Sequence, residues 1–360
     1  MSDEDSIEKI LKGRAQLIDQ YIEKYIPREY REDSLMFGLD PPKYTPDFEA
    51  LGKAVSEPFW EFLERGGKRW RPVLFLLVCE ALGADPEKCL DFAVIPEVIH
   101  NGTLIADDIE DSSELRRGKP CIHELFGHDI AINLSALMYF LPMKALRQKA
   151  EKVPDEKARR MYDIYIQEMI NLGLGQAIDI AWHKGLTPAD KVTESQYLQM
   201  CAYKTGTLAR MAAQMAAVLS DADNDTVEKM GRFAESIGIA FQIQDDILDL
   251  VGEEFAKGKG GPGMDITEGK LTLMVVHTLQ KADSTDKKEL ETILDRHTRN
   301  KRLRKKAIEI IGKYGSIAYA SDLASKMVSD SWSEVDEALL PSEAKEKLRS
   351  LADHLIKREI

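Results

Sequence analysis

The chain has 360 residues, of which 44% are hydrophobic and 31% charged, and its formal net charge at pH 7 is −13. An acidic balance of this size disfavours binding to nucleic acid or to an anionic membrane, because both would require a basic face. Cys79, Cys89, Cys121 and Cys201 have no CxxC spacing, which indicates neither a zinc site nor a disulfide framework. The sequence shows neither an apolar run of membrane-spanning length nor a signal-peptide pattern, so we expect a cytoplasmic protein without an integral membrane segment.

The hydrophobic spacing indicates helices along the whole chain, with no shift to a strand-like period. Residues 5–25 carry apolar side chains at helical spacing and predict an amphipathic surface helix, whereas the prolines within 27–46 exclude one continuous helix there. No Gly/Ser-rich or Pro-rich linker divides the rest of the chain. We therefore predict an all-α fold in which residues 1–50 form an N-terminal extension and residues 51–360 form a single helical domain.

The first distinctive motif is a turn rich in cations. Gly66 and Gly67 end the preceding helix and should place Lys68, Arg69 and Arg71 on a tight, exposed turn before the next helix. Guanidinium groups bind phosphate oxygens in pairs, so the turn is a candidate anion site. Taken alone, it could equally be a solvated basic loop.

Two aspartate clusters, residues 107–111 and 245–249, share the spacing DDxxD, and each follows an apolar helical run. On a helix, the aspartates of one cluster lie on one face within about one turn, where like charges repel each other. A single cluster could be a solvated helix end, but two clusters indicate oxygen ligands for divalent cations, and Mg²⁺ combines such ligands with substrate phosphates. The predicted metal ligands are Asp107, Asp108, Asp111, Asp245, Asp246 and Asp249.

Two further features lie between the clusters. Asp179 is part of a long apolar helix and should find a cation or another donor, such as a lysine, because a buried acid without a partner is costly. Lys204, Thr205 and Gly206 interrupt the next helical run. Gly206 could kink that helix and turn backbone carbonyls outward, or it could be a glycine tolerated in an ordinary helix.

Taken together, these motifs resemble the trans-type isoprenyl diphosphate synthases of the short-chain polyprenyl synthase family, and the DDIED form of the first cluster is most similar to geranylgeranyl diphosphate synthases. The matching segments, in the order of the family, are residues 66–72, His100, 107–118, 175–179, 204–206, 241–245 and 265–272.

The resemblance implies an all-α bundle with a deep central cavity and the two aspartate-rich helices at its mouth. It implies head-to-tail condensation of isopentenyl diphosphate with dimethylallyl, geranyl or farnesyl diphosphate to geranylgeranyl diphosphate (C20) by a homodimer. Magnesium, about three ions that Mn²⁺ could replace, would bind the allylic diphosphate. A C25 product, farnesyl diphosphate and a non-catalytic subunit of a heteromeric synthase stay open as alternatives.

The resemblance also assigns roles to individual residues. Those implied to bind isopentenyl diphosphate are Lys68, Arg71, His100 and Arg117. Those implied to bind the allylic diphosphate are Arg116, Lys204, Thr205, Gln242, Lys259 and Lys270, with Lys257 as an alternative to Lys259. Those implied to be catalytic are Asp107, Asp108, Asp111, Lys204, Thr205, Gln242 and Asp245.

Product length should depend on the helix that precedes the first aspartate cluster, since each turn adds about 5.4 Å of depth. Gly102 and Thr103 are small there, which favours growth beyond C15. Tyr139 and Phe140 match an aromatic floor in the relatives, and Gly173 replaces a histidine found in some of them. We expect replacement of both aromatics by alanine to lengthen the product and Gly102→Phe to shorten it, although the aromatic pair could also be ordinary core.

Overall fold

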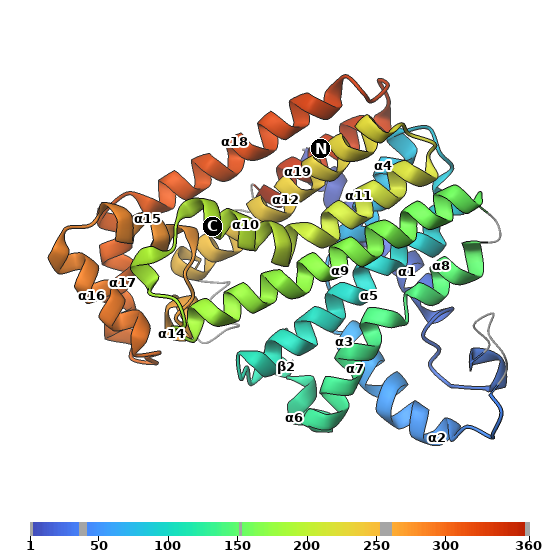
Figure 1. Ribbon diagram of the computed structural model, residues 1–360, viewed down its shortest axis with the longest axis horizontal. Helices are drawn as coiled ribbons and strands as arrows, with labels where there is room; N and C mark the ends of the chain where they lie inside the picture. The colour runs from blue at the N-terminus through green and yellow to red at the C-terminus, as the bar shows by residue number, and fades with distance from the viewer. Residues whose placement is uncertain (1–2, 36–41, 151–152, 253–260, 357–360) are drawn as a thin grey trace. The chain divides into compact units, whose positions relative to one another are not determined.

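The computed structural model describes residues 3–35, 42–150, 153–252 and 261–356 (Figure 1). These ranges are mostly helical, which confirms the predicted all-α class. Within them the strands are β1 (Leu115–Arg116) and β2 (Lys119–Pro120), a short antiparallel pair that the hydrophobic spacing did not predict.

The chain forms two compact units. The first consists of Met1–Ile166, Met211–Glu228 and Leu339–Leu351, and the second of Gln167–Arg210, Lys229–Ala338 and Ala352–Ile360. The predicted boundary at residue 50 does not coincide with this division, and whether residues 1–50 act as a separate extension stays a prediction.

The helices of the first unit are α1 (Asp3–Glu23), α2 (Phe48–Leu51), α3 (Glu57–Leu63), α4 (Trp70–Ala81), α5 (Pro86–Glu110), α6 (Ile122–Phe126), α7 (His128–Phe140) and α8 (Met143–Ala150). Those of the second are α10 (Glu194–Cys201), α14 (Met264–Glu268), α15 (Leu273–Lys281), α16 (Ser284–Asp295), α17 (Lys301–Lys313) and α18 (Ser316–Asp336). Helices with residues in both units are α9 (Asp155–His183), α11 (Thr207–Leu219), α12 (Asn224–Val251) and α19 (Glu343–Ile356).

Helix α5 is the core helix of the first unit. Asp85 caps it by accepting a hydrogen bond from the Glu87 backbone N–H, and Pro86 occupies its first turn, where a missing N–H costs nothing. Its apolar side chains pack against α4 and α7, and Ile95 and Ile99 are fully buried. The last turn of this buried helix carries the first aspartate cluster.

The N-terminal helix α1 packs against α4 and α5. Its apolar residues recur at helical spacing, and Ile7, Leu11, Ile18 and Ile22 are all less than 5% exposed. The predicted amphipathic helix is therefore confirmed, and its apolar face is part of the core of the first unit.

Helix α12 of the second unit resembles α5, because it is a buried helix that ends in an aspartate cluster. Ile237, Ala240 and Ile243 are fully buried, and the second aspartate cluster follows in the last turns of the helix. Helix α15 packs against α10 and α18, and α16 packs against α17.

Two segments of the described chain, Pro86–Glu110 and His128–Lys149, are long and apolar enough to cross a membrane by length and composition. Within their most apolar windows, 72% and 50% of the residues are buried inside the structure. Such burial is typical of core helices, so the composition of these segments is weak evidence for a membrane span.

Candidate active site

The first aspartate cluster is held by an arginine from the β-hairpin. The Arg116 guanidinium donates through Nε and Nη2 to Oδ1 of Asp108, at 2.7 and 2.5 Å, and its Nη2 lies 3.7 Å from Oδ2 of Asp107. Asp108 is 1% exposed, and its burial raises the pKa of its carboxyl group while Arg116 opposes that rise. Arg116 thus joins the hairpin to the end of α5.

The donors of this cluster fit a magnesium ion. Oδ2 of Asp108 is buried and accepts no hydrogen bond from the described residues, so it keeps its attraction for a cation. The cluster offers carboxylate oxygens, which suit Mg²⁺ better than softer metals. Among the residues the structure describes, no three His, Cys, Asp or Glu side chains are grouped to hold a metal by themselves.

The cation turn begins where α3 ends. Gly66 and Gly67 have φ angles of 94° and 140°, which side chains rarely allow, and this confirms the predicted break. Lys68 is exposed as predicted, but Arg69 and Arg71 are only 3% and 4% exposed. The prediction that all three cations are exposed was therefore wrong, because α4 and its neighbours enclose two of them.

Of the residues expected to bind isopentenyl diphosphate, Arg71, His100 and Arg117 lie near one another. Arg117 donates to the carbonyl oxygen of Gly66. Partial loss of hydration and the charge of Arg69 lower the pKa of Arg117 to about 10. Burial, together with Arg71 and Arg117, lowers the pKa of His100 well below its usual value. A bound anion would relieve the repulsion among these groups.

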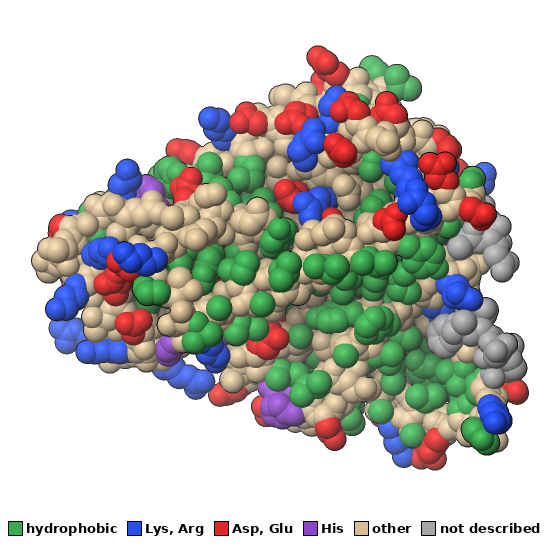
Figure 2. Space-filling view, viewed as in Figure 1, with side chains coloured by type: hydrophobic (Ala, Val, Ile, Leu, Met, Phe, Trp, Pro, Cys, Tyr) green, Lys and Arg blue, Asp and Glu red, His purple; other side chains and the backbone are tan. Residues whose placement is uncertain are grey.

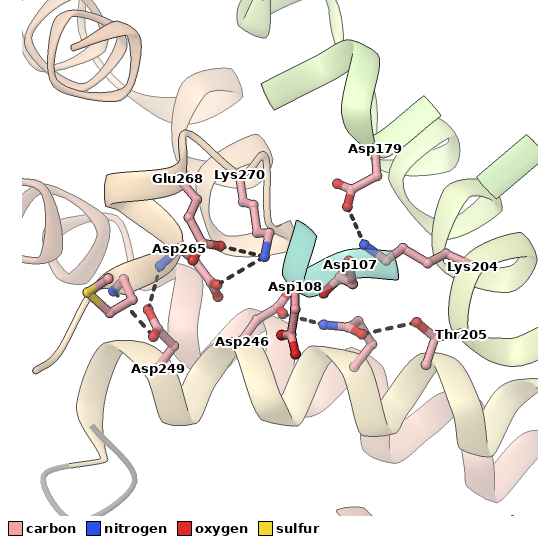
Figure 3. Close-up of polar contacts among 12 residues, drawn as sticks. Asp107, Asp108, Asp179, Lys204, Thr205, Asp246, Asp249, Asp265, Glu268 and Lys270 are labelled. Atoms are coloured by element: carbon pink, nitrogen blue, oxygen red, sulfur yellow. Dashed lines mark hydrogen bonds and ion pairs between the residues drawn. The ribbon is translucent and has the colours of Figure 1, made fainter. Parts of the chain in front are cut away.

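In the second unit, Lys204 lies in a π-helical turn, Ala202–Gly206, between α10 and α11. Its Nζ lies 2.5 Å from Oδ2 of Asp179 (Figure 3), so the prediction of a lysine partner for this acid is confirmed. The segment is irregular, because this π-helical turn ends at Gly206, and whether Gly206 kinks the helix and exposes backbone carbonyls stays a prediction.

Glycines allow two helices to approach this turn closely. A Cβ atom at Gly175 of α9 would overlap the backbone nitrogen of Lys204. A Cβ atom at Gly238 of α12 would lie 2.7 Å from the Cα atom of Gly206. Packing at both sites holds the backbone of Lys204 and Thr205 in place.

A chain of hydrogen bonds joins the turn to the second aspartate cluster (Figure 3). The hydroxyl group of Thr205 donates to Oε1 of Gln242 at 3.0 Å, and Nε2 of Gln242 donates to Oδ1 of Asp246 at 2.7 Å. The hydroxyl group of Tyr197 donates to the other oxygen of Asp246 at 3.0 Å. Burial and the nearby Asp265 raise the pKa of Asp246 well above its usual value. Both oxygens of Asp246 therefore accept hydrogen bonds from the protein. A metal-ligand role for this residue stays a prediction.

Asp249 caps a helix. Its oxygens accept hydrogen bonds from the backbone N–H groups of Met264 and Asp265, at 3.2 and 3.1 Å, at the start of α14. The residue is 1% exposed. Of the three aspartates in this cluster, Asp249 thus holds the segment that leads to Lys270, and its metal-ligand role also stays a prediction.

Lys270 follows α14 and pairs with acids that the sequence did not single out. Its Nζ lies 2.5 Å from Oε2 of Glu268 and 3.9 Å from Oδ1 of Asp265. Figure 3 shows the three side chains converging. Lys257 and Lys259, the other lysines expected near the allylic diphosphate, lie outside the described residues.

The residues expected to control product length lie in different environments. Oγ of Ser135 donates to the carbonyl oxygen of Gly102 at 2.9 Å, and a Cβ atom at Gly102 would lie 2.9 Å from that of Met138. Gly102 therefore lets α5 and α7 pack closely, and a Cβ atom there, as in the Gly102→Phe variant, would require one of these neighbours to shift. Half-buried Thr103 donates to the carbonyl oxygen of His100 at 2.7 Å.

The aromatic pair is divided. Tyr139 is half-buried, with its ring close to Gly102, whereas Phe140 is 69% exposed. Gly173 is exposed, and a Cβ atom there would meet nothing within 4 Å. In the single chain both residues lie on outward faces of their helices, and their role in product length stays a prediction.

Comparison with known proteins agrees with this arrangement. The protein-family model described as "Polyprenyl synthetase" matches residues 52–311 of this chain. The short chain isoprenyl diphosphate synthase of Methanothermobacter thermautotrophicus is 35% identical over 294 residues, which cover 82% of this chain and 87% of that protein. The geranylgeranyl diphosphate synthase of Saccharolobus solfataricus is 33% identical over 307 residues, which cover 85% and 91%.

Among solved structures, the geranylgeranyl pyrophosphate synthetase from Pyrococcus horikoshii has a TM-score of 0.85 and 31% identity, with 99% of this chain and 100% of that chain covered. A family match over most of the chain, relatives of more than 30% identity and a shared fold lead to one conclusion. This chain belongs to the polyprenyl synthetase family.

Proposed function

We propose that this protein is a prenyltransferase that condenses isopentenyl diphosphate with an allylic diphosphate and releases geranylgeranyl diphosphate. The observation that carries the proposal is the set of motifs within the family match: the cation turn, the π-helical turn and both aspartate clusters, all with their chemical groups present. Relatives that are named geranylgeranyl diphosphate synthases, at 31–33% identity, support the C20 product.

We assign the carboxylates of both clusters to metal binding: Asp107, Asp108, Asp111, Asp245, Asp246 and Asp249. Asp108, Asp246 and Asp249 also accept hydrogen bonds from the protein through one or both oxygens. These carboxylates would hold about three Mg²⁺ ions, which would supply charge neutralisation for the allylic diphosphate and for the departing pyrophosphate.

Three cations assigned to the allylic diphosphate are paired with acids in the structure. Arg116 is paired with Asp108, Lys204 with Asp179 and Lys270 with Glu268, each at 2.5 Å. These ion pairs hold the long side chains in extended positions before the substrate arrives, which lowers the entropy cost of ordering them. The substrate phosphates then take the place of a carboxylate or share the cation with it.

The remaining side chains act on the reacting carbons. The backbone carbonyls near Thr205 and the amide oxygen of Gln242 stabilise the allylic cation, because they are fixed dipoles that need no reorganisation. Lys68, Arg71, His100 and Arg117 hold the diphosphate of the second substrate. Burial and the nearby arginines lower the pKa of His100, and its ring can donate a hydrogen bond to the same diphosphate.

Incubation with labelled isopentenyl diphosphate, Mg²⁺ and each allylic starter in turn tests the proposal. After removal of phosphate, chromatography should show a C20 alcohol as the main product from dimethylallyl, geranyl and farnesyl diphosphate. A main product of C15 or C25 would contradict the chain-length assignment. No product from any starter would identify the chain as a non-catalytic subunit.

Tyr139→Ala is expected to shift the main product beyond C20, whereas Phe140→Ala should leave it unchanged. The Tyr139 ring lies beside α5, since its Cε1 atom would be 3.2 Å from a Cβ atom at Gly102. Phe140, at 69% exposure, is the matched aromatic control. The measurement is the same product chromatography. A C20 product from the Tyr139 variant, or an equal shift from both, would remove Tyr139 as the limit to growth.

We also propose that the protein is a homodimer that acts in the cytoplasm. Helix α9 exposes Ile166, Ile170 and Leu174, each at least 50% exposed and spaced four residues apart on one face. Figure 2 shows hydrophobic side chains gathered along this helix. Large apolar patches of this kind mark protein interfaces, and light scattering should give the mass of two chains rather than one.

A further inference from the structure

Arg69 is a buried junction in the first unit. Its Nε donates to Oδ1 of Asp19 at 2.9 Å, and its Nη2 donates to the carbonyl oxygen of Leu63 at 2.9 Å. Its Nη1 donates to the carbonyl oxygen of Gly66 and to Oε1 of Glu97, both at 3.3 Å. One guanidinium group, 2% exposed, therefore joins α1, the end of α3, the cation turn and α5.

These contacts exclude Arg69 as a direct ligand of substrate and give it another task. Its backbone has a φ of 51°, a left-handed conformation that is strained for a residue other than glycine and persists only when the surroundings fix it. The residue lies between Lys68 and Arg71, so the conformation at this position sets the direction of both side chains. The buried guanidinium group is the anchor that fixes it.

The same anchor reaches Arg117. The carbonyl oxygen of Gly66 accepts hydrogen bonds from both Arg69 and Arg117. A Cβ atom at Gly67 would lie 2.6 Å from Nη1 of Arg69 and 3.1 Å from Nη2 of Arg117, so the two guanidinium groups enclose this peptide. A shift of Arg69 would therefore move the turn and Arg117 together.

Asp19 belongs to the N-terminal helix, outside the segment that matches the family model. It lies next to the buried Ile18 and is 37% exposed through its side chain. Glu97 is the other carboxylate that contacts Arg69, and it also accepts a hydrogen bond from Nδ2 of Asn101 at 3.1 Å. Asp19 is thus the residue of α1 that helps to neutralise the buried Arg69.

We propose that Asp19 is a positioning residue of the isopentenyl diphosphate site: it holds Arg69, and Arg69 holds the turn that presents Lys68 and Arg71 and that contacts Arg117. This inference rests on the proposed function of that turn. It gives the N-terminal helix a specific task, because diphosphate recognition by several cations requires each one to be placed to within a fraction of an ångström.

The test compares Asp19→Ala with Arg14→Ala. Arg14 is the matched control, because its Nη2 lies 2.5 Å from Oε1 of Glu80 and ties the same helix α1 to α4 at another point. Steady-state kinetics with each substrate varied in turn should show a KM for isopentenyl diphosphate raised about tenfold in Asp19→Ala, the effect of one lost charge-assisted hydrogen bond. The KM for the allylic substrate and kcat should stay within about twofold. Arg14→Ala should lower thermal stability without changing either KM.

Asp19→Asn and Asp19→Glu extend the test. The asparagine variant keeps the shape of the side chain and removes its charge, so it should raise the same KM by a smaller factor even if the alanine variant fails to fold. The glutamate variant should restore part of the loss. Equal KM values for isopentenyl diphosphate in the Asp19 and Arg14 variants, or equal effects on both substrates, would overturn this inference alone. Absence of product from the unaltered protein would overturn the proposed function, and this inference with it.

Discussion

Replacing either Asp107 or Asp245 by alanine is expected to lower kcat by at least about a hundredfold, comparable to the loss of a strong electrostatic contact in the transition state. Each residue opens a DDxxD cluster at the end of a largely buried helix, where the backbone cannot move to bring another acid into its place. The measurement is kcat at saturating Mg²⁺ and substrates.

Glu110→Gln is the control for this pair. Glu110 lies within the first cluster and is exposed, so its replacement removes a nearby negative charge without removing a DDxxD aspartate. We expect kcat within about threefold of the unaltered protein, the range of a screened surface charge. If Asp107→Ala or Asp245→Ala retained the full kcat, the assignment of these clusters to metal binding would be wrong.

Arg210→Ala should lower the free energy of unfolding by about 3–5 kcal/mol, the usual cost of removing one partner of a buried ion pair. In the second unit, Nε and Nη2 of Arg210 donate to the two oxygens of Glu168 at 2.8 and 2.9 Å, and Nη1 contacts Glu235. Glu168 is 3% exposed and also accepts a hydrogen bond from the hydroxyl group of Thr207. Without Arg210, a buried carboxylate would lose its countercharge.

Urea unfolding with Arg159→Ala as the control measures this effect. Arg159 pairs with Asp163 at 3.0 Å, but the two side chains are 68% and 62% exposed, so this pair should contribute less than about 1 kcal/mol. Arg210→Lys should recover only part of the loss, because lysine keeps the charge and not the two-pronged geometry. Similar unfolding midpoints for the Arg210 and Arg159 alanine variants would contradict the importance of this network.

Features that depend on local spacing could be predicted from the sequence. The helices follow from the period of the apolar residues, the break before α4 follows from Gly66 and Gly67, and the aspartate clusters follow from the spacing DDxxD. The lysine partner of Asp179 could also be predicted, because a buried acid has few alternatives. The helices, the break and the clusters depend on residues within one segment. The partner of Asp179 lies further away, but only a cation or a hydrogen-bond donor could fill that role.

Features that depend on distant partners could not be predicted. Nothing local shows that Arg69 is buried, because its partner Asp19 is 50 residues away. Tyr197 resembles an ordinary core aromatic until its hydroxyl group is seen to donate to Asp246. The small size of Gly102 suggested free space, whereas that size is what allows two helices to touch. Local spacing identifies a chemical group, but tertiary packing decides which groups it contacts.

The most direct test of the central claim, that the aspartate clusters bind the allylic diphosphate through Mg²⁺, is calorimetric titration with an unreactive allylic thiolodiphosphate and with isopentenyl diphosphate. The thiolodiphosphate should bind only when Mg²⁺ is present, and its binding should be lost in Asp107→Ala and Asp245→Ala. Isopentenyl diphosphate should bind with or without Mg²⁺, because the positive charge at its proposed site comes from Lys68, Arg71 and Arg117. Tight binding of the thiolodiphosphate without Mg²⁺, or undiminished binding in both variants, would contradict the claim.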